Sequence, residues 1–539
     1  MARVLVVEPV DQAGIDVLTA AHQTDLRLDL PRDDLLGLLA EGGGYDALVV
    51  RSQTRVDAEV LRAAAPRLSV VGVASIGTDK IDIDAATRAG VMVVNAPTGN
   101  TIAAAEHTMA LMLALLRRIP SADASVRGGT WERGRFTGGE LRGKVLGVIG
   151  LGKIGRQVCR RALAFEMKVL ANDPYITAEQ ASEVGARLVG LTELLQRAEV
   201  VTVHTPLTAQ TRGMLGRPQL DAMRRGVFCL NVARGGIYDE KALAEALASG
   251  HVAGAAVDVF SAEPMAPDNP LRAAPNTVFT PHLGASTREA QARVGHEMAE
   301  QVVMALAGIT PPYAVNAPAV AADVAPRLRP YVELARRLAI LGRQLGDGPI
   351  GAVGLTYAGE IAAWDGSPLR TAALAGLLDA VTDQRVNAVN ADLVARERGL
   401  SVSETRTEAS EPWASLLTLD LSSGAAVAPR TPGRRLAGST AHGRPHLVSL
   451  DGFEIDAELA GTVLVTHHHD RPGVVGAVGT LLAEAGVNIS SLELSRLSAA
   501  GEAMMFVSVD EGVPAAALER LRDHEAIVDA RVVQLPILG

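Results

Sequence analysis

Residues 147–158 read GVIGLGKIGRQV, an apolar strand pattern that leads directly into a helix pattern. Gly150, Gly152 and Gly155 stand in the spacing G-x-G-x-x-G. In such a turn the first glycine permits the tight bend, the second lets the backbone approach a pyrophosphate, and the third allows close helix–strand packing. The helix N-terminus adds amide donors and the positive end of a dipole. We therefore expect a dinucleotide-binding loop formed by Gly150, Gly152, Lys153, Ile154 and Gly155.

The strand after this loop ends in an acidic residue, which helps to decide whether the turn binds a cofactor. The same glycine spacing also occurs in tight strand–helix turns that bind nothing. Here KVLANDP, residues 168–174, brings a second apolar strand to its end at Asp173. An acidic residue at that place accepts hydrogen bonds from the adenosine ribose and repels the additional phosphate of NADP. The two features together predict NAD as the cofactor.

Short Val-rich runs alternate with helix patterns on both sides of the loop, from RVLVVE at residues 3–8 to NTVFTPH at residues 276–282. Continuous apolar strands between helices indicate parallel sheets covered on both faces. A Pro-rich stretch at residues 309–318 ends this region. Mixed patterns follow, and the last part of the chain reads strand, helix, strand, strand, helix, strand, which is a ferredoxin-like order. We predict an α/β protein with two doubly wound parallel-sheet domains, followed by an α+β domain and a ferredoxin-like domain.

Three strands after the glycine loop end in residues suited to proton transfer. NVARGGIYDE carries Arg234 at a strand end, VDVFSAEP carries Asp258 within the next strand and Glu263 just after it, and TPHLGAST carries His282 after the last strand. Ligands of open α/β sheets bind beyond the carboxyl ends of the strands, so these side chains should meet in one crevice. A histidine beside a nicotinamide can exchange a proton near neutral pH, a glutamate can stabilise its imidazolium form, and an arginine can bind a carboxylate through two bonds. Taken singly, each residue is equally well explained as a surface arginine, a Glu-Pro turn or a cap.

GLGKIGR, NVARGGIYDE, VDVFSAEP and TPHLGAST, in this order, resemble the D-isomer-specific 2-hydroxyacid dehydrogenases over about residues 1–316. The resemblance implies a substrate-binding domain made from residues 1–98 and 287–316 around an NAD-binding domain at residues 99–286. It implies that Arg234 binds substrate, that His282 is the acid/base and that Glu263 is the partner of His282. It also implies nicotinamide contacts from Thr205, Ala233, Asp258, His282, Gly284 and Ala285.

The C-terminal extension resembles that of a long subgroup of the same family, with an intervening domain at residues 317–456 and a regulatory ACT domain at residues 460–539. Members of this subgroup oxidise 3-phosphoglycerate in L-serine biosynthesis. The resemblance therefore implies 3-phosphoglycerate as substrate and L-serine as feedback effector. In the stretch THHHDRPGVVGAVGTLLAEAGVNIS, residues 466–490, it implies effector contacts from His468, Asp470 and Asn488.

The three consecutive histidines also raise the possibility of a metal site. Successive residues on a strand point to opposite faces, so three in a row cannot all reach one ion. We find no third ligand at a spacing suited to a tetrahedral site, and we predict no metal. A second nucleotide loop is disfavoured because no acidic strand end follows this stretch.

The segment VGVASIGTDKID, residues 71–82, departs from the pattern of the long subgroup, which has an arginine where this chain has Val73. A valine cannot replace a cationic contact to the substrate phosphate. Arg51, or Arg133 and Arg135 supplied by a partner subunit, are the candidates to meet that phosphate. The remaining expected substrate contacts are the backbone of Ser75, Ile76 and Gly77, the side chain of Asn100, and Arg234. The departure leaves open another 2-hydroxy acid, such as 2-hydroxyglutarate, and a non-catalytic protein that senses NAD.

Composition limits the other classes of function. The net charge of −10 argues against non-specific nucleic-acid binding, and no apolar run is long enough for a membrane span. Two cysteines in apolar runs and no signal-peptide pattern suit the cytoplasm. The helix pattern at residues 100–118 is apolar over more than one stripe, and ACT units tend to pair, so we expect a homodimer or homotetramer.

Overall fold

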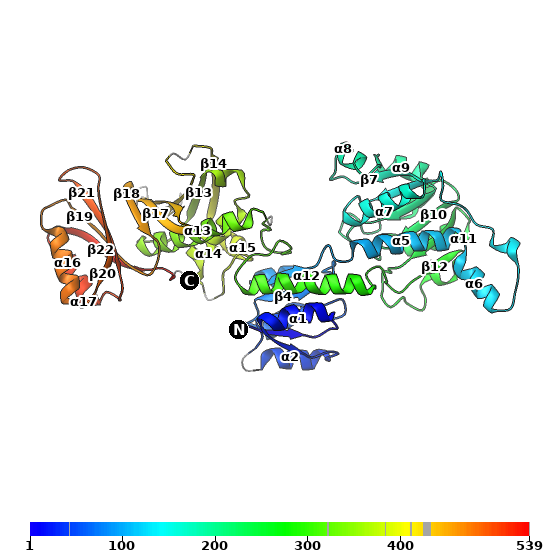
Figure 1. The fold of residues 1–539 in the computed structure, drawn as a ribbon, viewed down its shortest axis with the longest axis horizontal. Coiled ribbons are helices and arrows are strands. Elements are labelled where there is room, and N and C mark those ends of the chain that lie inside the picture. The colour runs from blue at the N-terminus through cyan, green and yellow to red at the C-terminus, as the bar shows by residue number, and fades with distance from the viewer. Residues whose placement is uncertain (42–43, 321–322, 383, 410–411, 424–432, 538–539) are drawn as a thin grey trace.

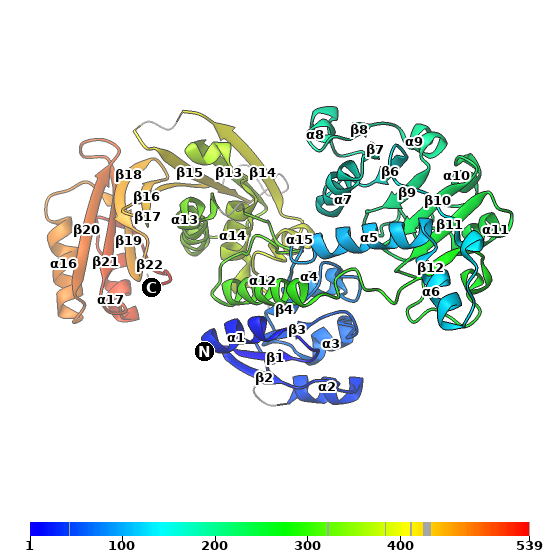
Figure 2. The same cartoon turned by 45° about the vertical axis from the view of Figure 1, so that its right-hand side comes forward.

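The computed structural model describes residues 1–41, 44–320, 323–382, 384–409, 412–423 and 433–537. It contains four sheets that follow one another along the chain. Figures 1 and 2 show an elongated molecule, in which an outer lobe built on the first sheet and a nucleotide lobe built on the second are followed by two C-terminal domains. None of the helices in the described part of the chain has the length and apolar character needed to cross a bilayer.

The outer lobe is a parallel five-stranded sheet in the order β2-β1-β3-β4-β5. Its strands are β1 (Arg3–Val6), β2 (Gln23–Leu26), β3 (Ala47–Val50), β4 (Val70–Val73) and β5 (Met92–Asn95). Its helices are α1 (Gln12–Ala21), α2 (Arg32–Ala40), α3 (Ala58–Ala63), α4 (Ile83–Arg88) and, from much later in the chain, α12 (Arg288–Leu306). One apolar cluster joins one face of the sheet to α2, α3 and α4, and another joins the opposite face to α1 and α12. The outer lobe is therefore completed by a helix that follows the nucleotide lobe in sequence.

The nucleotide lobe is a parallel seven-stranded sheet in the order β12-β11-β10-β9-β6-β7-β8. Its strands are β6 (Val145–Ile149), β7 (Lys168–Asn172), β8 (Arg187–Leu188), β9 (Val200–Val203), β10 (Val227–Asn231), β11 (Val252–Val257) and β12 (Thr277–Phe279). Its helices are α5 (Thr101–Leu116), α6 (Ile119–Arg127), α7 (Lys153–Ala164), α8 (Ala178–Ser182), α9 (Leu191–Arg197), α10 (Arg217–Ala222) and α11 (Glu240–Ala248), with 3-10 turns η1 (Arg133–Phe136) and η2 (Pro270–Ala273). Helices α5, α7 and α8 cover one face, and α9, α10 and α11 the other.

The third sheet is mixed, in the order β14-β13-β15-β16-β17-β18. Its strands are β13 (Ala352–Gly359), β14 (Ser401–Thr407), β15 (Ser415–Ser422), β16 (Arg434–Ala441), β17 (Arg444–Leu450) and β18 (Phe453–Glu458). Its helices are α13 (Ala325–Leu345), α14 (Ser367–Leu378) and α15 (Ala391–Glu397), with 3-10 turns η3 (Glu360–Ala363) and η4 (Asp379–Val381).

The fourth sheet is antiparallel, in the order β20-β21-β19-β22. Its elements are β19 (Thr462–His469), α16 (Val474–Glu484), β20 (Ile489–Arg496), β21 (Glu502–Val509), α17 (Ala515–Arg522) and β22 (Ile527–Gln534). The two helices pack on one face of the sheet. On the other face, Val463, Val465 and Phe506 join Phe453 and Ile455 of β18 in a single apolar cluster. The last two domains therefore share one core.

The predicted fold class is confirmed, including the ferredoxin-like order at the C-terminus. The domain boundaries stay predictions, but one of them does not match the observed elements. The intervening domain was expected to end at residue 456, whereas β18 continues to Glu458, because its alternating apolar residues cover the ACT sheet. A smaller correction concerns Asp258, expected within a strand. Strand β11 ends at Val257, which places Asp258 in the loop that follows.

Candidate active site

A cleft of about 900 Å³ lies between the outer lobe and the nucleotide lobe. Carboxyl-end loops of β10, β11 and β12 form one wall, and the loop after β4 forms the other. Many of the predicted site residues line this cleft: Arg51, Ser75, Ile76, Gly77, Asn100, Ile154, Ala233, Arg234, Asp258, Glu263, His282, Gly284 and Ala285. The sheet topology explains why these residues lie together, because parallel strands present their carboxyl ends at one edge of a sheet.

His282 and Glu263 form a hydrogen-bonded pair in the cleft. Nδ1 of His282 lies 2.8 Å from Oε2 of Glu263, and the other oxygen of Glu263 accepts from the Phe260 amide at 3.0 Å. The bond to Glu263 raises the pKa of His282 and outweighs the opposing effect of burial. Burial opposes ionisation of Glu263, yet the bonds from His282 and Phe260 bring its pKa below the ordinary value. Glu263 is therefore a charged acceptor that fixes one ring nitrogen and favours the protonated imidazole.

Arg234 stands at the end of β10 on a loop held by its neighbours. The side chain of Asn231 accepts from the Ala233 amide at 3.1 Å and donates to the Arg234 carbonyl at 2.9 Å. A Cβ on Gly235 would lie 1.9 Å from the Phe260 carbonyl oxygen, so only glycine allows this loop to pack against the loop that leads to Glu263. The Arg234 side chain itself donates from Nε to Asp79 of the outer lobe at 3.1 Å.

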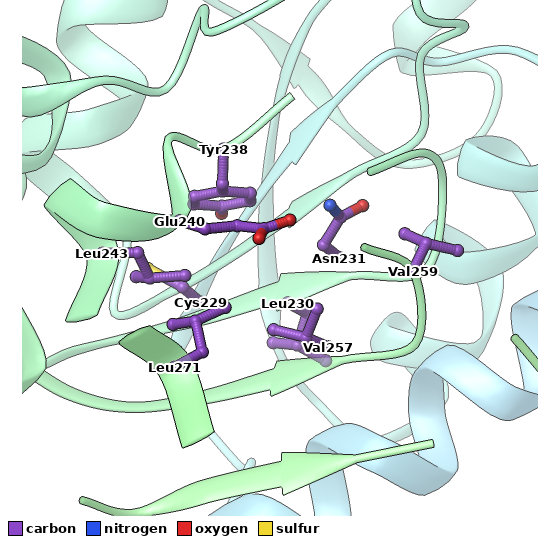
Figure 3. A pocket seen from close by; sticks show the side chains of 9 residues that line it. All are labelled: Cys229, Leu230, Asn231, Tyr238, Glu240, Leu243, Val257, Val259 and Leu271. Atoms are coloured by element: carbon purple, nitrogen blue, oxygen red, sulfur yellow. The ribbon is translucent and has the colours of Figure 1, made fainter. Parts of the chain in front are cut away.

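Behind these loops lies a small pocket, lined by Asn231, Tyr238 and Glu240 together with apolar side chains (Figure 3). The Glu240 carboxylate accepts from the Ser261 amide and from the Asn269 side chain, both at 2.6 Å. Asn231 and Glu240 thus anchor the loops that carry Arg234 and Glu263. We did not predict either residue, although both are polar and stand at the strand and helix ends that flank Arg234. Burial raises the pKa of Cys229, which also lines this pocket, to about 12, so its thiol is not a nucleophile.

The glycine loop has room for a dinucleotide. Gly150 has a φ of +91°, and a Cβ there would lie 2.6 Å from the His204 carbonyl oxygen. A Cβ on Gly155 would lie 2.1 Å from the Gly150 carbonyl oxygen, while Gly152, at the N-terminus of α7, faces open space. The Asp173 carboxylate accepts from the Leu151 amide at 2.8 Å, which places it at the mouth of the turn. This cradle fits the pyrophosphate and ribose of NAD.

Other predicted cofactor residues lie around the same region. Thr205, predicted to contact the cofactor, and Asn100, predicted to contact the substrate, each have a buried side-chain oxygen without a hydrogen-bond partner in the described part of the chain, as expected of groups that meet a ligand. The Lys153 ammonium lies 5.2 Å from the centre of the Tyr313 ring, a contact that reaches from α7 to the segment after α12. Its role in the dinucleotide-binding loop stays a prediction.

Asp258 is fully buried beneath the loop that carries His282. Its carboxylate accepts from the Thr280 hydroxyl at 2.6 Å and from the Leu283 and Gly284 amides at 2.7 and 3.0 Å, and it lies 3.2 Å from Nε2 of His107. Burial opposes ionisation of this carboxyl, but the bonds from His107 and Thr280 lower its pKa. In this structure Asp258 therefore orders the loop over residues 280–284.

The loop after β4 has internal support. Asn95 donates to the Ile76 carbonyl at 2.6 Å, and the Ser75 hydroxyl donates to the Gly77 carbonyl at 2.7 Å. Val73 is buried in β4 and offers nothing to a phosphate. The basic residues that line the cleft are Arg51, Lys80 and Arg234. Arg133 and Arg135 lie in η1 and are not among the residues that line this cleft.

In the C-terminal domain the predicted effector residues face different surroundings. His468 is 2% exposed, with its ring beside the Thr466 hydroxyl. Asp470 accepts from Arg496 and from the Ala500 amide, both at 3.1 Å. Asn488 donates to Asp510 at 2.6 Å. The ring of His468 is inside the core and is not exposed beside the other two residues.

The histidine run alternates along β19, as the strand geometry predicts. His467 meets the Phe453 ring edge-on at 5.8 Å, whereas the next ring, that of His468, is buried. Within the described residues, no group of three or more His, Cys, Asp or Glu side chains could hold a metal ion.

Three family models match the chain. D-isomer specific 2-hydroxyacid dehydrogenase, NAD binding domain, matches residues 109–284. D-3-phosphoglycerate dehydrogenase intervening domain matches residues 327–450, and ACT domain matches residues 462–526.

Curated relatives match along the whole chain. D-3-phosphoglycerate dehydrogenase of Archaeoglobus fulgidus is 40% identical, with 99% of this chain and 100% of the relative covered. The Bacillus subtilis protein of the same name is 38% identical with the same coverage.

Solved structures match more than half of the chain. The TT0316 protein from Thermus thermophilus has a TM-score of 0.54 and 37% identity over 58% of this chain and 99% of that one. D-lactate dehydrogenase from Aquifex aeolicus, solved with NAD and lactic acid, has a TM-score of 0.50 and 27% identity over 57% of this chain and 96% of its own. By its full-length relatives and its three matching domains, this chain belongs to the D-3-phosphoglycerate dehydrogenase family, a branch of the NAD-dependent D-isomer-specific 2-hydroxyacid dehydrogenases.

Proposed function

We propose that this chain oxidises 3-phosphoglycerate to 3-phosphohydroxypyruvate with NAD, as the first step of L-serine biosynthesis. The observation that carries the proposal is the His282–Glu263 pair, which shares one cleft with Arg234 beside a glycine loop suited to NAD. The names of the full-length relatives support the substrate.

Held by the glycine loop and Asp173, NAD would supply the acceptor for the hydride that leaves the carbon carrying the substrate hydroxyl. His282 accepts the hydroxyl proton at Nε2, because Nδ1 is engaged by Glu263 at 2.8 Å. Glu263 stabilises the imidazolium that forms. Arg234 binds the substrate carboxylate, and the backbone of Ser75–Gly77 supplies further donors. We propose that Arg51 meets the phosphate in place of the missing arginine at position 73, with Lys80 as a second cation of the same cleft.

We further propose that L-serine binds at the ACT end, near Asp470 and Asn488, and that the chain forms a homodimer or homotetramer. The apolar side chains of Ile119, Val126 and Trp131 are more than half exposed beside the nucleotide lobe, which supports a subunit contact there. Work in a reducing cytoplasm agrees with the two buried free cysteines.

The test is NADH formation from 3-phosphoglycerate and NAD at alkaline pH, with and without L-serine, and with 2-hydroxyglutarate and D-lactate as competing substrates. We expect 3-phosphoglycerate to have the highest kcat/KM and L-serine to inhibit. His282→Asn should lower kcat by roughly 100-fold or more while NAD still binds. The matched control is His296→Asn, since His296 is an exposed histidine of α12 whose ring also contacts a glutamate.

A higher kcat/KM for another hydroxy acid would assign the enzyme to that substrate. Binding of NAD without turnover of any of the three acids would favour the NAD-sensing protein.

A further inference from the structure

Arg234 belongs to the nucleotide lobe, but its side chain is held by the outer lobe. Its Nε donates to Oδ2 of Asp79 at 3.1 Å, across a sequence separation of 155 residues. Gly77, in the same loop, lies directly beneath the guanidinium, because a Cβ there would be 2.3 Å from Nη2. The loop over residues 77–79 therefore contacts the guanidinium through both a backbone surface and a carboxylate.

The donors of Arg234 are only partly used by these contacts. A guanidinium has five N–H groups in a fixed plane. One goes from Nε to Asp79, and one goes from Nη1 to the Ala233 carbonyl at 2.8 Å. The two N–H groups that point away from Nε, one on each Nη nitrogen, form the fork that binds a carboxylate in two parallel bonds. Asp79 engages Nε and the Ala233 carbonyl engages one N–H of Nη1, so three N–H groups of the guanidinium have no partner in the described part of the chain.

We propose that Asp79 is a positioning residue for substrate recognition, which fixes the guanidinium of Arg234 so that its remaining N–H groups face the carboxylate of the substrate. The proposal rests on the proposed function, in which Arg234 binds that carboxylate. Because the two residues come from different lobes, the orientation exists only when the lobes are close together. Carboxylate binding and closure of the cleft are thereby coupled through one ion pair.

The alternative is that Asp79 occupies the place of the substrate and must be displaced. The two ideas predict opposite changes in substrate affinity. Loss of a positioning carboxylate weakens substrate binding, whereas loss of a competing carboxylate strengthens it. A merely structural role for Asp79 would change thermal stability and NADH binding without changing the KM for the substrate selectively.

The experiment compares the full-length wild type with Asp79→Ala, Asp79→Asn and Asp79→Glu. Asp84→Asn is the control, since Asp84 is an exposed aspartate on α4 of the same lobe and its substitution makes the same change in charge. We expect Asp79→Ala to raise the KM for 3-phosphoglycerate about 10-fold or more, with the KM for NAD and the thermal midpoint unchanged. Asp79→Asn keeps an acceptor and should have a smaller effect, and Asp79→Glu should partly restore the wild-type KM. An unchanged or lower substrate KM in Asp79→Ala would overturn the proposal.

A second measurement separates this proposal from the choice of substrate. Oxalate is a minimal dicarboxylate probe, and its binding to the NADH-loaded protein can be followed by NADH fluorescence. If the wild type does not oxidise 3-phosphoglycerate, the proposed function fails, yet about 10-fold weaker oxalate binding in Asp79→Ala still supports the role of Asp79. Equal binding in the two proteins, or no binding to the wild type, overturns it.

Discussion

At the scale of single residues, His282 combines an uncommon backbone conformation with a specific partner. Its φ of +57° lies in the left-handed region, where a residue other than glycine is strained. The conformation is held by the His282 amide, which donates to the Asp258 carbonyl at 2.8 Å, while Nδ1 meets Glu263. Asp258 also binds the two following amides, so one buried residue orders the loop on which the proposed base stands.

The pair formed by His282 and Glu263 predicts the pH dependence of the reaction. Oxidation of an alcohol needs neutral His282, so kcat/KM should increase as the pH rises through the pKa of this histidine. Glu263 raises that pKa. Glu263→Gln removes the charge and should move the rise of kcat/KM to lower pH, while lowering the maximum roughly 10- to 100-fold. Initial rates of NADH formation between about pH 5 and pH 10 measure both effects.

The control for this variant is Glu300→Gln on the exposed face of α12, where Glu300 lies 3.3 Å from His296. It removes the same kind of histidine–carboxylate pair outside the cleft and should leave the profile unchanged. A rise that stays in place, or moves to higher pH, in Glu263→Gln would contradict the assignment of His282 as the base.

At the scale of elements, the two chain segments that connect the lobes are hydrogen-bonded to each other. One leads into α5 and the other into α12. Glu297 of α12 accepts from the amides of Thr98 and Gly99, at 3.2 and 3.1 Å, and from the Thr98 hydroxyl. Arg293, one turn earlier, donates to the Gly99 carbonyl at 3.0 Å. Residues 98–99 lead into α5, so α12 holds the start of the helix that crosses to the nucleotide lobe. One glutamate and one arginine of α12 therefore hold the segment that leads into α5.

Glu297→Ala should loosen this crossing. Three acceptor contacts disappear and two backbone donors lose their partner, so we expect a loss of about 2 kcal/mol in the free energy of unfolding and a severalfold lower kcat/KM. Urea unfolding of the full-length protein and initial rates measure the two effects. Glu300→Ala, one turn further along α12 and exposed, is the control. A Glu297 variant as active and as stable as this control would show that the crossing does not need the carboxylate.

Local patterns predicted the elements well, because the glycine loop and the polar strand ends each depend on a few consecutive residues. The G-x-G-x-x-G spacing and the positions of Arg234, Glu263 and His282 after their strands needed no long-range information. Contacts between distant segments could not be read in this way. The pairing of Asp79 with Arg234 depends on how two lobes meet.

The buried ring of His468 illustrates the same limit. Alternation along β19 is local and was predicted. Which residues of the alternation become buried depends on what covers each face of the sheet, and here β18 covers one face while α16 and α17 cover the other. That packing involves segments outside the histidine run, so the burial of His468 was not foreseen.

At the scale of the whole molecule, the intervening and ACT domains behave as one body. Beyond their shared core, the buried Arg337 of α13 donates to the carbonyls of Leu459, Pro536 and Ile537 and pairs with Glu333. One arginine thus binds both the segment between β18 and β19 and the C-terminal segment of the ACT domain to the intervening domain. The shared core and these bonds join the ACT domain to the intervening domain, so the proposed effector site is linked to the catalytic lobes through the intervening domain.

The intervening domain contacts the outer lobe at the turn before β5. The far end of β5 contacts the loop after β4, which is expected to hold the substrate. Asn387 donates to the Gly90 carbonyl at 2.7 Å, and Gly90, with a φ of +65°, forms the turn between α4 and β5. At the other end of β5, Asn95 donates to the Ile76 carbonyl at 2.6 Å. Strand β5 therefore connects the contact between Asn387 and Gly90 with the loop expected to hold the substrate.

This connection predicts the effect of Asn387→Ala. Removal of one interdomain hydrogen bond should release the Gly90 turn, so amide hydrogen exchange over residues 90–95 should become about fivefold faster, which corresponds to a net hydrogen bond of about 1 kcal/mol. Inhibition by L-serine should weaken by a similar factor, while activity without serine changes little, because Asn387 is far in sequence from the cleft residues and does not line the cleft. The control is Gln384→Ala, since Gln384 is an exposed amide on the same loop. If exchange over β5 is the same in both variants, the contact at Gly90 does not stabilise the strand, and a signal from the ACT end must reach the substrate loop by another route, such as Asn316, whose side chain accepts from the Val93 amide at 2.8 Å.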